Sequence, residues 1–195
     1  FSKVFRFCPD KDFQNNYTVK FEYDRACTVP SDINYHLPKL NELARSVNHV
    51  TEFGVRTGES TRAFLYSDVV LRSYDLYKDP YVEKMFNDCD MSGKDVRFIQ
   101  GNSLSIDIEE TDLLFIDTDH SYNQLKAELD RHNDKVRKYL VFHDTQTYGC
   151  NPNQNNAGLI PAIMELLCHD KRWSVNYFTT INNGLTVLEK ALINY

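Results

Sequence analysis

Two polar clusters, each directly after an apolar run, hold the side chains best suited to chemistry. The run LLFI is followed by DTDHSY, residues 117–122, and the run LVF is followed by His143 and Asp144. If these runs form neighbouring parallel strands, the strand ends lie roughly 5 Å apart and Asp117 faces Asp144. Two carboxylates that close repel each other unless a proton or a cation lies between them. Oxygen ligands suit Mg²⁺ or Mn²⁺, and His143 either adds a nitrogen ligand or serves as a supporting histidine behind the site.

A glycine-spaced loop is the second candidate site. The segment EFGVRTGES, residues 52–60, follows an apolar run, and Gly54 lets the chain turn while a ligand approaches its backbone. Gly58 opens the next expected helix, whose free N–H groups favour an anionic group. The spacing also fits a plain strand-to-helix turn, and it is not the Gly-x-Gly-x-x-Gly pattern of dinucleotide sites.

Polar residues at two further strand ends extend this candidate cofactor site. Asp75 lies 21 residues after Gly54, where an acid can accept hydrogen bonds from both hydroxyls of a ribose. Asn102 and Ser103 follow the next expected strand and can bond an adenine edge. Taken singly, these residues fit a surface acid and a polar turn. Taken with the glycine loop and the two charged clusters, which are expensive to bury without a ligand, they indicate a binding site.

Alternating apolar periods along the chain predict an α/β fold. Strands are expected over 49–53, 69–76, 96–100, 112–117, 139–144, 173–180 and 185–190, and helices over 31–47, 59–67, 79–89, 121–136 and 158–170. Ser31 or Asp32 is the expected cap of the first helix, and the residues before it show no clean period. This order implies a mostly parallel sheet with helices on both faces, and Asn183-Gly184 marks a final antiparallel hairpin.

Composition limits the possible partners. The 195 residues suit one domain, with residues 1–45 as an extension that helps to form the acceptor site and 46–195 as the core. A net charge of −6 disfavours nucleic acid, and no apolar run approaches the ~20 residues of a membrane span. The chain begins with Phe1 rather than Met, as expected of a piece cut from a longer polypeptide or of a processed chain. An odd number of scattered cysteines predicts reduced thiols in a cytoplasmic protein, with a zinc site disfavoured (Cys8, Cys27, Cys89, Cys150 and Cys168).

Together these motifs resemble a known family. The pattern Glu52-x-Gly54-x-x-x-Gly58, Asp75, LLFIDTDHSY and VFHDT are similar to class I S-adenosylmethionine-dependent methyltransferases. The resemblance is greatest to small-molecule O-methyltransferases related to macrolide-sugar and cephalosporin-pathway enzymes, several of them Mg²⁺-dependent. It covers roughly residues 45 to 190 and implies a Rossmann-like fold with a seven-stranded sheet. Two departures lie in turns: Thr118 replaces a glycine, and residues 137–139 replace a glycine pair.

The resemblance implies a role for each matched residue. Asp117, Asp144 and His143 would hold Mg²⁺ or Mn²⁺, and His120 would be the general base beside Asp117. A divalent cation lowers the pKa of an aliphatic hydroxyl, and a histidine can take its proton as the oxygen attacks the sulfonium methyl. The residues expected to bind S-adenosylmethionine are Glu52, Gly54, Val55, Arg56, Thr57, Gly58, Ser60, Asp75, Asn102, Ser103 and Asp117.

The expected acceptor is a small molecule or a glycan. Histidine at position 120, where catechol-type relatives tend to carry lysine, favours a sugar such as a terminal deoxyhexose, and fusion to glycosyltransferase domains would fit that substrate. An oligomer is compatible with the sequence. The expected acceptor contacts are Tyr35, His120, Tyr122 and Tyr148, with Tyr23, His36 and the Asn-rich loop 145–158 as further candidates.

Three other functions remain open from the residues alone. A metal-independent O-methyltransferase of small alcohols would use the same fold. A non-catalytic cofactor-binding module would keep the glycine loop, although Asp117, His120 and Asp144 together argue against it. A dehydrogenase is disfavoured by the glycine spacing.

Overall fold

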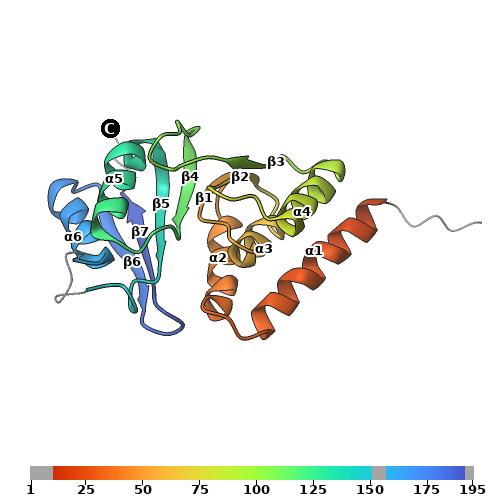
Figure 1. Cartoon of the computed structure of the whole chain (residues 1–195), viewed down its shortest axis with the longest axis horizontal. Coiled ribbons are helices and arrows are strands. Elements are labelled where there is room, and N and C mark those ends of the chain that lie inside the picture. Colours follow the sequence, from red (N-terminus) through yellow and green to blue (C-terminus); the bar gives the residue numbers. More distant parts are fainter. Residues whose placement is uncertain (1–10, 151–156, 192–195) are drawn as a thin grey trace, which may run out of the picture.

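A computed structural model describes residues 11–150 and 157–191. They form one seven-stranded sheet in the order β3-β2-β1-β4-β5-β7-β6, with helices on both faces (Figure 1). Strands β1 to β5 pair in parallel, and β7 runs antiparallel to both β5 and β6. The mostly parallel sheet with a C-terminal antiparallel hairpin is therefore confirmed.

The elements alternate as the sequence predicts from β1 onward. The strands are β1 His49–Phe53, β2 Val70–Asp75, β3 Val96–Gln100, β4 Thr111–Ile116, β5 Val136–His143, β6 Trp173–Thr179 and β7 Leu185–Lys190. The helices are α1 Lys11–Thr28, α2 Leu37–Ala44, α3 Glu59–Leu65, α4 Pro80–Met91, α5 Tyr122–His132 and α6 Leu159–His169, with 3-10 turns η1 Asn34–His36 and η2 Asn133–Lys135.

Two apolar cores lie on opposite faces of the sheet. In Figure 1, α1 to α4 lie on one side of the strands and α5 and α6 on the other. Strand β4 serves both faces, because Leu113 and Phe115 belong to the first core and Leu114 and Ile116 to the second. A strand buried on both faces loses the apolar–polar alternation and reads as a continuous apolar run, as LLFI does.

Helix α1 is an element that the sequence did not predict. Val19, Tyr23, Ala26 and Cys27 follow helical spacing and pack against the first core. Phe21 on another side of the helix is exposed, and charged residues surround this short stripe. The stripe is therefore too narrow to appear as a clean period.

The expected helix over 31–47 is shorter than predicted. Helix α2 begins at Leu37 after η1, and its N-cap is His36, which makes no capping hydrogen bond through its side chain. The expected cap at Ser31 or Asp32 is therefore wrong. Pro38 lies in the first turn of α2, where its missing N–H costs nothing, and it marks the start of the helix.

The boundary between α5 and β5 also differs from the prediction. The helix expected over 121–136 ends at His132, and η2 replaces its last turn. Strand β5 then begins at Val136 rather than at Tyr139.

Residues 31–36 are tied to the turn of the β6–β7 hairpin. Asn182 Nδ2 donates to the carbonyl oxygen of Ser31 at 2.7 Å, and Tyr35 N–H donates to Asn182 Oδ1 at 2.9 Å. His36 Nε2 lies 2.9 Å from the carbonyl oxygen of Asn182 and donates to it. Asn182 has a φ of 49°, a left-handed conformation that asparagine tolerates better than most residues. One side chain therefore joins the segment between α1 and α2 to the C-terminal hairpin.

Two expectations from composition concern cysteines and membranes. Within the described residues, Cys27, Cys89, Cys150 and Cys168 are free thiols, and Cys8 lies outside them. No helix in residues 11–150 and 157–191 has the length and apolar character to cross a membrane.

Asn182→Ala tests the link between residues 31–36 and the turn of the β6–β7 hairpin. Loss of two hydrogen bonds and of the left-handed preference should lower the free energy of unfolding by about 2 to 3 kcal/mol. Urea denaturation measures it. Asn176→Ala, which removes an exposed bond to Glu189, is the matched control and should change stability by less than about 1 kcal/mol. Equal losses in both variants would contradict the proposed tie.

Candidate functional site

The ends of β1 and β4 meet where the strand order reverses. From β1 the chain proceeds outward through β2 to β3, and β4 then lies on the other side of β1, so the strand order reverses between β1 and β4, the usual place for a ligand. At Gly54, which has a φ of +83°, an added Cβ atom would lie 1.9 Å from the carbonyl oxygen of Asp117. Only glycine fits this crossing, and it brings the two predicted loops into contact.

Asp75 at the end of β2 holds the glycine loop in place. Its Oδ2 accepts hydrogen bonds from the backbone N–H groups of Val55 and Arg56, both at 2.8 Å, and its Oδ1 accepts from that of Tyr77 at 3.1 Å. A carboxylate has about four acceptor positions, so one remains. Asp75 therefore shapes the loop and keeps one acceptor position for a ligand, and its role as a ribose acceptor stays a prediction.

Glu52 lies beneath the loop and is fully buried. Its carboxyl oxygens accept hydrogen bonds from Ser60 at 2.6 Å, Thr61 at 3.0 Å and Ser73 at 2.5 Å. Burial raises the pKa of Glu52 to about 7, against the opposing effect of the three hydroxyl donors. Glu52 thus positions the loop from below and is not exposed to a ligand.

A cavity of about 300 Å³ opens beside Asp75. The predicted residues Asn102 and Ser103 line it, together with Gly101 and Tyr74. The other lining residues come from the glycine loop, the end of β2, the segment after β4 and the start of α5: Gly54, Arg56, Asp75, Leu76, Asp117, Thr118, Asp119 and Gln124.

Glu128 on α5 organises one wall of this cavity, and sequence reasoning missed it. Its buried carboxylate accepts from Ser103 Oγ at 2.6 Å, Thr118 Oγ1 at 2.9 Å and Gln124 Nε2 at 2.9 Å. Burial raises its pKa despite those donors. The hydroxyl of Thr118, which replaces a glycine of the resembling family, therefore binds the buried acid. A glutamate on the apolar face of the expected helix was the available signal.

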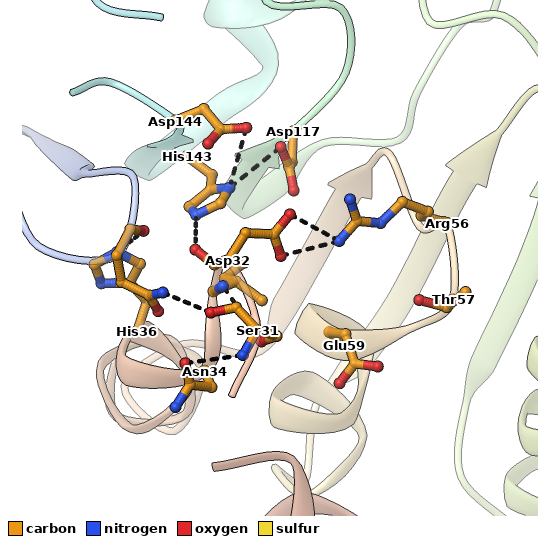
Figure 2. A network of polar contacts seen from close by, with 12 residues as sticks. Ser31, Asp32, Asn34, His36, Arg56, Thr57, Glu59, Asp117, His143 and Asp144 are labelled. Atoms are coloured by element: carbon orange, nitrogen blue, oxygen red, sulfur yellow. Dashed lines mark hydrogen bonds and ion pairs between the residues drawn. The ribbon is translucent and has the colours of Figure 1, made fainter. Parts of the chain in front are cut away.

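A second cavity, of about 110 Å³, lies next to the first and shares Gly54, Arg56, Asp117 and Thr118 with it. Its far wall contains His120 and Asp144, and Ile33 closes it from the N-terminal segment. Arg56 Nη2 donates to both carboxylate oxygens of Asp32, at 2.9 and 3.0 Å. Figure 2 shows this pair joining the glycine loop to the segment after α1.

Four charged or titratable side chains converge at the end of the second cavity. The register pairs Ile116 with Phe142, so Asp117 and His143 follow at the same level. His120 Nε2 lies 2.7 Å from Asp144 Oδ2 and 3.4 Å from Asp117 Oδ1. His143 Nδ1 lies 3.3 Å from Asp117 Oδ1 and 3.6 Å from Asp144 Oδ2 (Figure 2). The predicted meeting of the two aspartates occurs, with a histidine on each side.

The charges of this cluster shift the pKa values of its members. Burial would lower the pKa of His120, but hydrogen bonds to Asp117 and Asp144 raise it to about 9. Burial disfavours ionised Asp117, yet His120 and His143 hold the pKa of that carboxyl well below its usual range. Without a cation, His120 is therefore an imidazolium at neutral pH and cannot accept a proton. Its role as general base stays a prediction.

The cluster has the donors that a divalent cation requires. Asp117, His120 and Asp144 each offer a ligand atom within 4.8 Å of the others. Among the described residues, neither His143 Nδ1 nor Asp144 Oδ1 has a hydrogen-bond partner, although both are buried. Buried polar atoms are normally paired, so these two atoms are available to a ligand.

The remaining predicted residues lie in several places. Tyr148 stacks on the ring of His120, with centroids 4.3 Å apart. Tyr122 donates its hydroxyl to Glu165 on α6 at 2.5 Å and lies outside the lining of both cavities. Thr57 and Tyr35 are exposed and also lie outside that lining.

Three of the predicted residues, one in the glycine loop and two in the N-terminal segment, have packing roles. Gly58 has a φ of +79° and packs against α4, where an added Cβ would lie 2.9 Å from Met85 Cε. Tyr23 stacks on Tyr66 with centroids 4.8 Å apart, away from the cluster. His36 is buried, with its ring edge 5.6 Å from that of His143. The Asn-rich loop lies partly outside the described residues, which omit 151–156.

Comparison with known proteins shows similarity in structure and not in sequence. Neither a protein-family model nor a curated protein sequence matches the chain. An O-methyltransferase from Bacillus cereus, solved with SAH, is similar with a TM-score of 0.62 at 15% identity, over 96% of this chain and 93% of that chain. The 1,6-didemethyltoxoflavin-N1-methyltransferase of Burkholderia thailandensis, with bound S-adenosylhomocysteine, gives 0.63 at 14% identity, over 98% and 94%. The N-methyltransferase NodS of Bradyrhizobium japonicum, with S-adenosylhomocysteine, gives 0.58 at 15% identity, over 90% and 98%.

This chain has the class I methyltransferase fold. The fold expected from the sequence resemblance is thereby confirmed. Because these similar structures include both O- and N-methyltransferases, the fold alone does not decide which acceptor atom is used.

Gly54→Ala tests the crossing at the centre of this methyltransferase fold. The clash with Asp117 adds to the backbone strain, so the free energy of unfolding should fall by several kcal/mol. Gly93→Ala is the matched control, because Gly93 also has a positive φ, +89°, but nothing lies within 4 Å of an added Cβ. It should lose only about 1 to 2 kcal/mol. Similar losses in chemical denaturation of both variants would contradict the close approach.

Glu52→Gln tests the buried acid through pH. The pKa of Glu52 is about 7 in the folded chain and 4.5 ordinarily. Below pH 4.5 the carboxyl is protonated in both states and does not lower stability. As the pH rises from 4.5 to 7, ionisation favours the unfolded state and the free energy of unfolding falls. The difference amounts to about 3 kcal/mol. Unfolding free energies measured from pH 4 to 8 should fall relative to those of Glu52→Gln. Glu42→Gln, at an exposed position, should retain the wild-type slope, and parallel curves for wild type and Glu52→Gln would contradict the assignment.

Proposed function

We propose that the chain is an S-adenosylmethionine-dependent O-methyltransferase that acts on a sugar hydroxyl with the aid of a divalent cation. The observation that carries the proposal is the junction of the two cavities. They share Gly54 and Asp117, one contains the Asp75 carboxylate, and the other ends at the Asp/His cluster. One elongated ligand can therefore lie between a ribose acceptor and a candidate cation site.

In this proposal the adenosine part of the cofactor occupies the larger cavity. Asp75 accepts from one ribose hydroxyl, and Asn102, Ser103 and Gln124 lie around the base. Structures of similar fold contain S-adenosylhomocysteine, which supports the choice of cofactor. The methionine part then lies in the smaller cavity, over Gly54 and Val55 and beside Ser60.

The reaction moves one methyl group from sulfur to oxygen. The acceptor oxygen forms a bond to the methyl carbon while the carbon–sulfur bond breaks, and the electron pair of that bond neutralises the sulfonium. The hydroxyl proton leaves to solvent or to a neutral base, and the products are a methyl ether and S-adenosylhomocysteine. A cation held by Asp117 and Asp144 would lower the pKa of the hydroxyl. In-line positioning supplies much of the remaining rate.

The acceptor is proposed to be a sugar with neighbouring hydroxyls. Tyr148, with 44% of its surface exposed, lies at the mouth of the cluster and offers an aromatic ring beside charged groups. Sugar rings pack on aromatic faces while their hydroxyls bond polar groups. Two adjacent hydroxyls would also suit a divalent cation.

The test is conversion of S-adenosylmethionine to S-adenosylhomocysteine over a panel of glycosides and catechols, each with and without EDTA. Turnover on a glycoside that EDTA abolishes and a divalent cation restores is the expected result. Asp117→Asn should lower kcat/KM by about 100-fold or more, because it weakens both cation and acceptor binding. Asp130→Asn, an exposed acid on α5, is the control and should retain activity.

The other outcomes separate the rival functions. Turnover that EDTA does not affect would replace the cation-assisted reaction with a metal-independent one. Cofactor binding in calorimetry with no turnover on any acceptor would favour a non-catalytic module. Turnover on amines alone would move the proposal to N-methylation.

A further inference from the structure

The Asp/His cluster holds two imidazole nitrogens as well as two carboxylates. His120 Nε2 lies 2.7 and 3.4 Å from oxygens of Asp144 and Asp117. His143 Nδ1 lies 3.3 and 3.6 Å from oxygens of the same two acids. Ligand atoms about 2.1 Å from a shared ion are roughly 3.0 Å apart at a right angle and 3.4 Å apart at a tetrahedral angle. Ligand atoms of Asp117, His120 and Asp144 all lie within 4.8 Å of one another, and His143 Nδ1 lies beside the same two carboxylates.

The orientation of His143 is that of a metal-binding histidine. Its Nε2 lies 3.1 Å from the carbonyl oxygen of Asp32, and a carbonyl can only accept, so Nε2 carries the proton. Nδ1 faces oxygens of two carboxylates, so it needs either a second proton or a cation between it and the acids. In the described part of the chain this nitrogen has no hydrogen-bond partner. A hydrogen bond from the second ring nitrogen to a carbonyl is the usual support of a metal-binding histidine.

Asp144 is also positioned to bind a cation. It has a φ of 62°, which is rare for a residue with a side chain, and its Oδ1 is buried without a partner among the described residues. Strain of this kind persists where the surrounding structure enforces it, and it concentrates at functional sites. The carboxylate is thus aimed at the cluster by a strained backbone.

We propose that this centre selects a divalent transition-metal ion that binds imidazole, such as Mn²⁺, Fe²⁺, Co²⁺ or Zn²⁺, over Mg²⁺, with His120 Nε2 and His143 Nδ1 as nitrogen ligands. The inference rests on the cation site of the proposed function and specifies its donor set. Mg²⁺ prefers oxygen ligands and retains water, whereas two imidazoles suit the later ions. His120 then binds the ion rather than accepting the acceptor proton.

The donor set also suits a positively charged cofactor. Two carboxylates and two neutral imidazoles balance the charge of a divalent ion, so the loaded centre carries no net charge beside the sulfonium. The stacked ring of Tyr148 keeps His120 in place from its outer side.

The experiment is metal titration of the full chain, first stripped of metal, by calorimetry with Mg²⁺, Mn²⁺ and Co²⁺. Co²⁺ should bind about 100-fold more tightly than Mg²⁺, and the affinity for Mn²⁺ should lie between the two. His120→Gln and His143→Gln should each weaken Co²⁺ binding by about 10- to 100-fold and leave Mg²⁺ binding within about threefold. His169→Gln, at an exposed histidine of α6, is the matched control and should change neither.

Pulsed EPR of the Mn²⁺-loaded protein gives a readout that does not depend on activity. Nitrogen couplings from coordinated imidazole are expected in the wild type and should diminish in each histidine variant. If His143→Gln fails to fold, as judged by thermal unfolding of the metal-free chain, His120→Gln carries the test, because this histidine is only half-buried.

Two outcomes would overturn the inference. Equal affinity for Mg²⁺ and Co²⁺, or no nitrogen coupling, would leave the cation-assisted function standing with oxygen ligands only. Binding of no divalent ion at all would overturn both the inference and the cation in the proposed function, while S-adenosylmethionine turnover in EDTA would still establish the methyltransferase.

Discussion

Parallel pairing of β1 with β4 and of β4 with β5 fixes where every charged group at the strand ends lies. The register places Phe53 beside Ile116 and Ile116 beside Phe142. The residues that follow therefore emerge at one level of the sheet edge: Gly54, Asp117 and His143. Contact between Gly54 and the Asp117 carbonyl leaves no space for a side chain between the loops, so the two cavities share one wall. A one-residue slip in either pairing would turn these groups to the other face of the sheet.

The free-energy cost of burying an acid at this edge of the sheet is offset in three different ways. Glu52 is surrounded by hydroxyl donors and burial raises its pKa to about 7, so it is readily neutral. Glu128 accepts from Ser103, Thr118 and Gln124, and these contacts give rigidity to the larger cavity. Asp117 stays ionised because two histidines lie beside it, and this holds the pKa of its carboxyl low. Only the third arrangement brings charged groups together at the end of a cavity.

Much of the fold follows from the sequence because the buried strands are short apolar runs followed by polar residues. The same pattern predicted that Asp117 and Asp144 would meet. Helix α1 was missed since only a narrow stripe of it is buried. The bonds by which Asp75 holds the glycine loop were missed, as was the role of Glu128, because hydrogen bonds to the backbone and to distant hydroxyls leave no periodic signal. The sequence shows that a histidine is present at position 120 but not where its side chain points. The direction of His120 Nε2 toward two carboxylates depends on side-chain rotamers and on strand register.

The hydrogen bond from Asn182 to residue 31 also affects when the site can form during synthesis. The contact spans 151 positions, so it cannot form during synthesis until almost the whole described chain has left the ribosome. The Asp32 carbonyl that orients His143 belongs to the same segment. Contacts between such distant positions are slow to form because a long loop must close first. A growing chain therefore carries the glycine loop and both aspartates well before their outer wall is in place, and the site matures last.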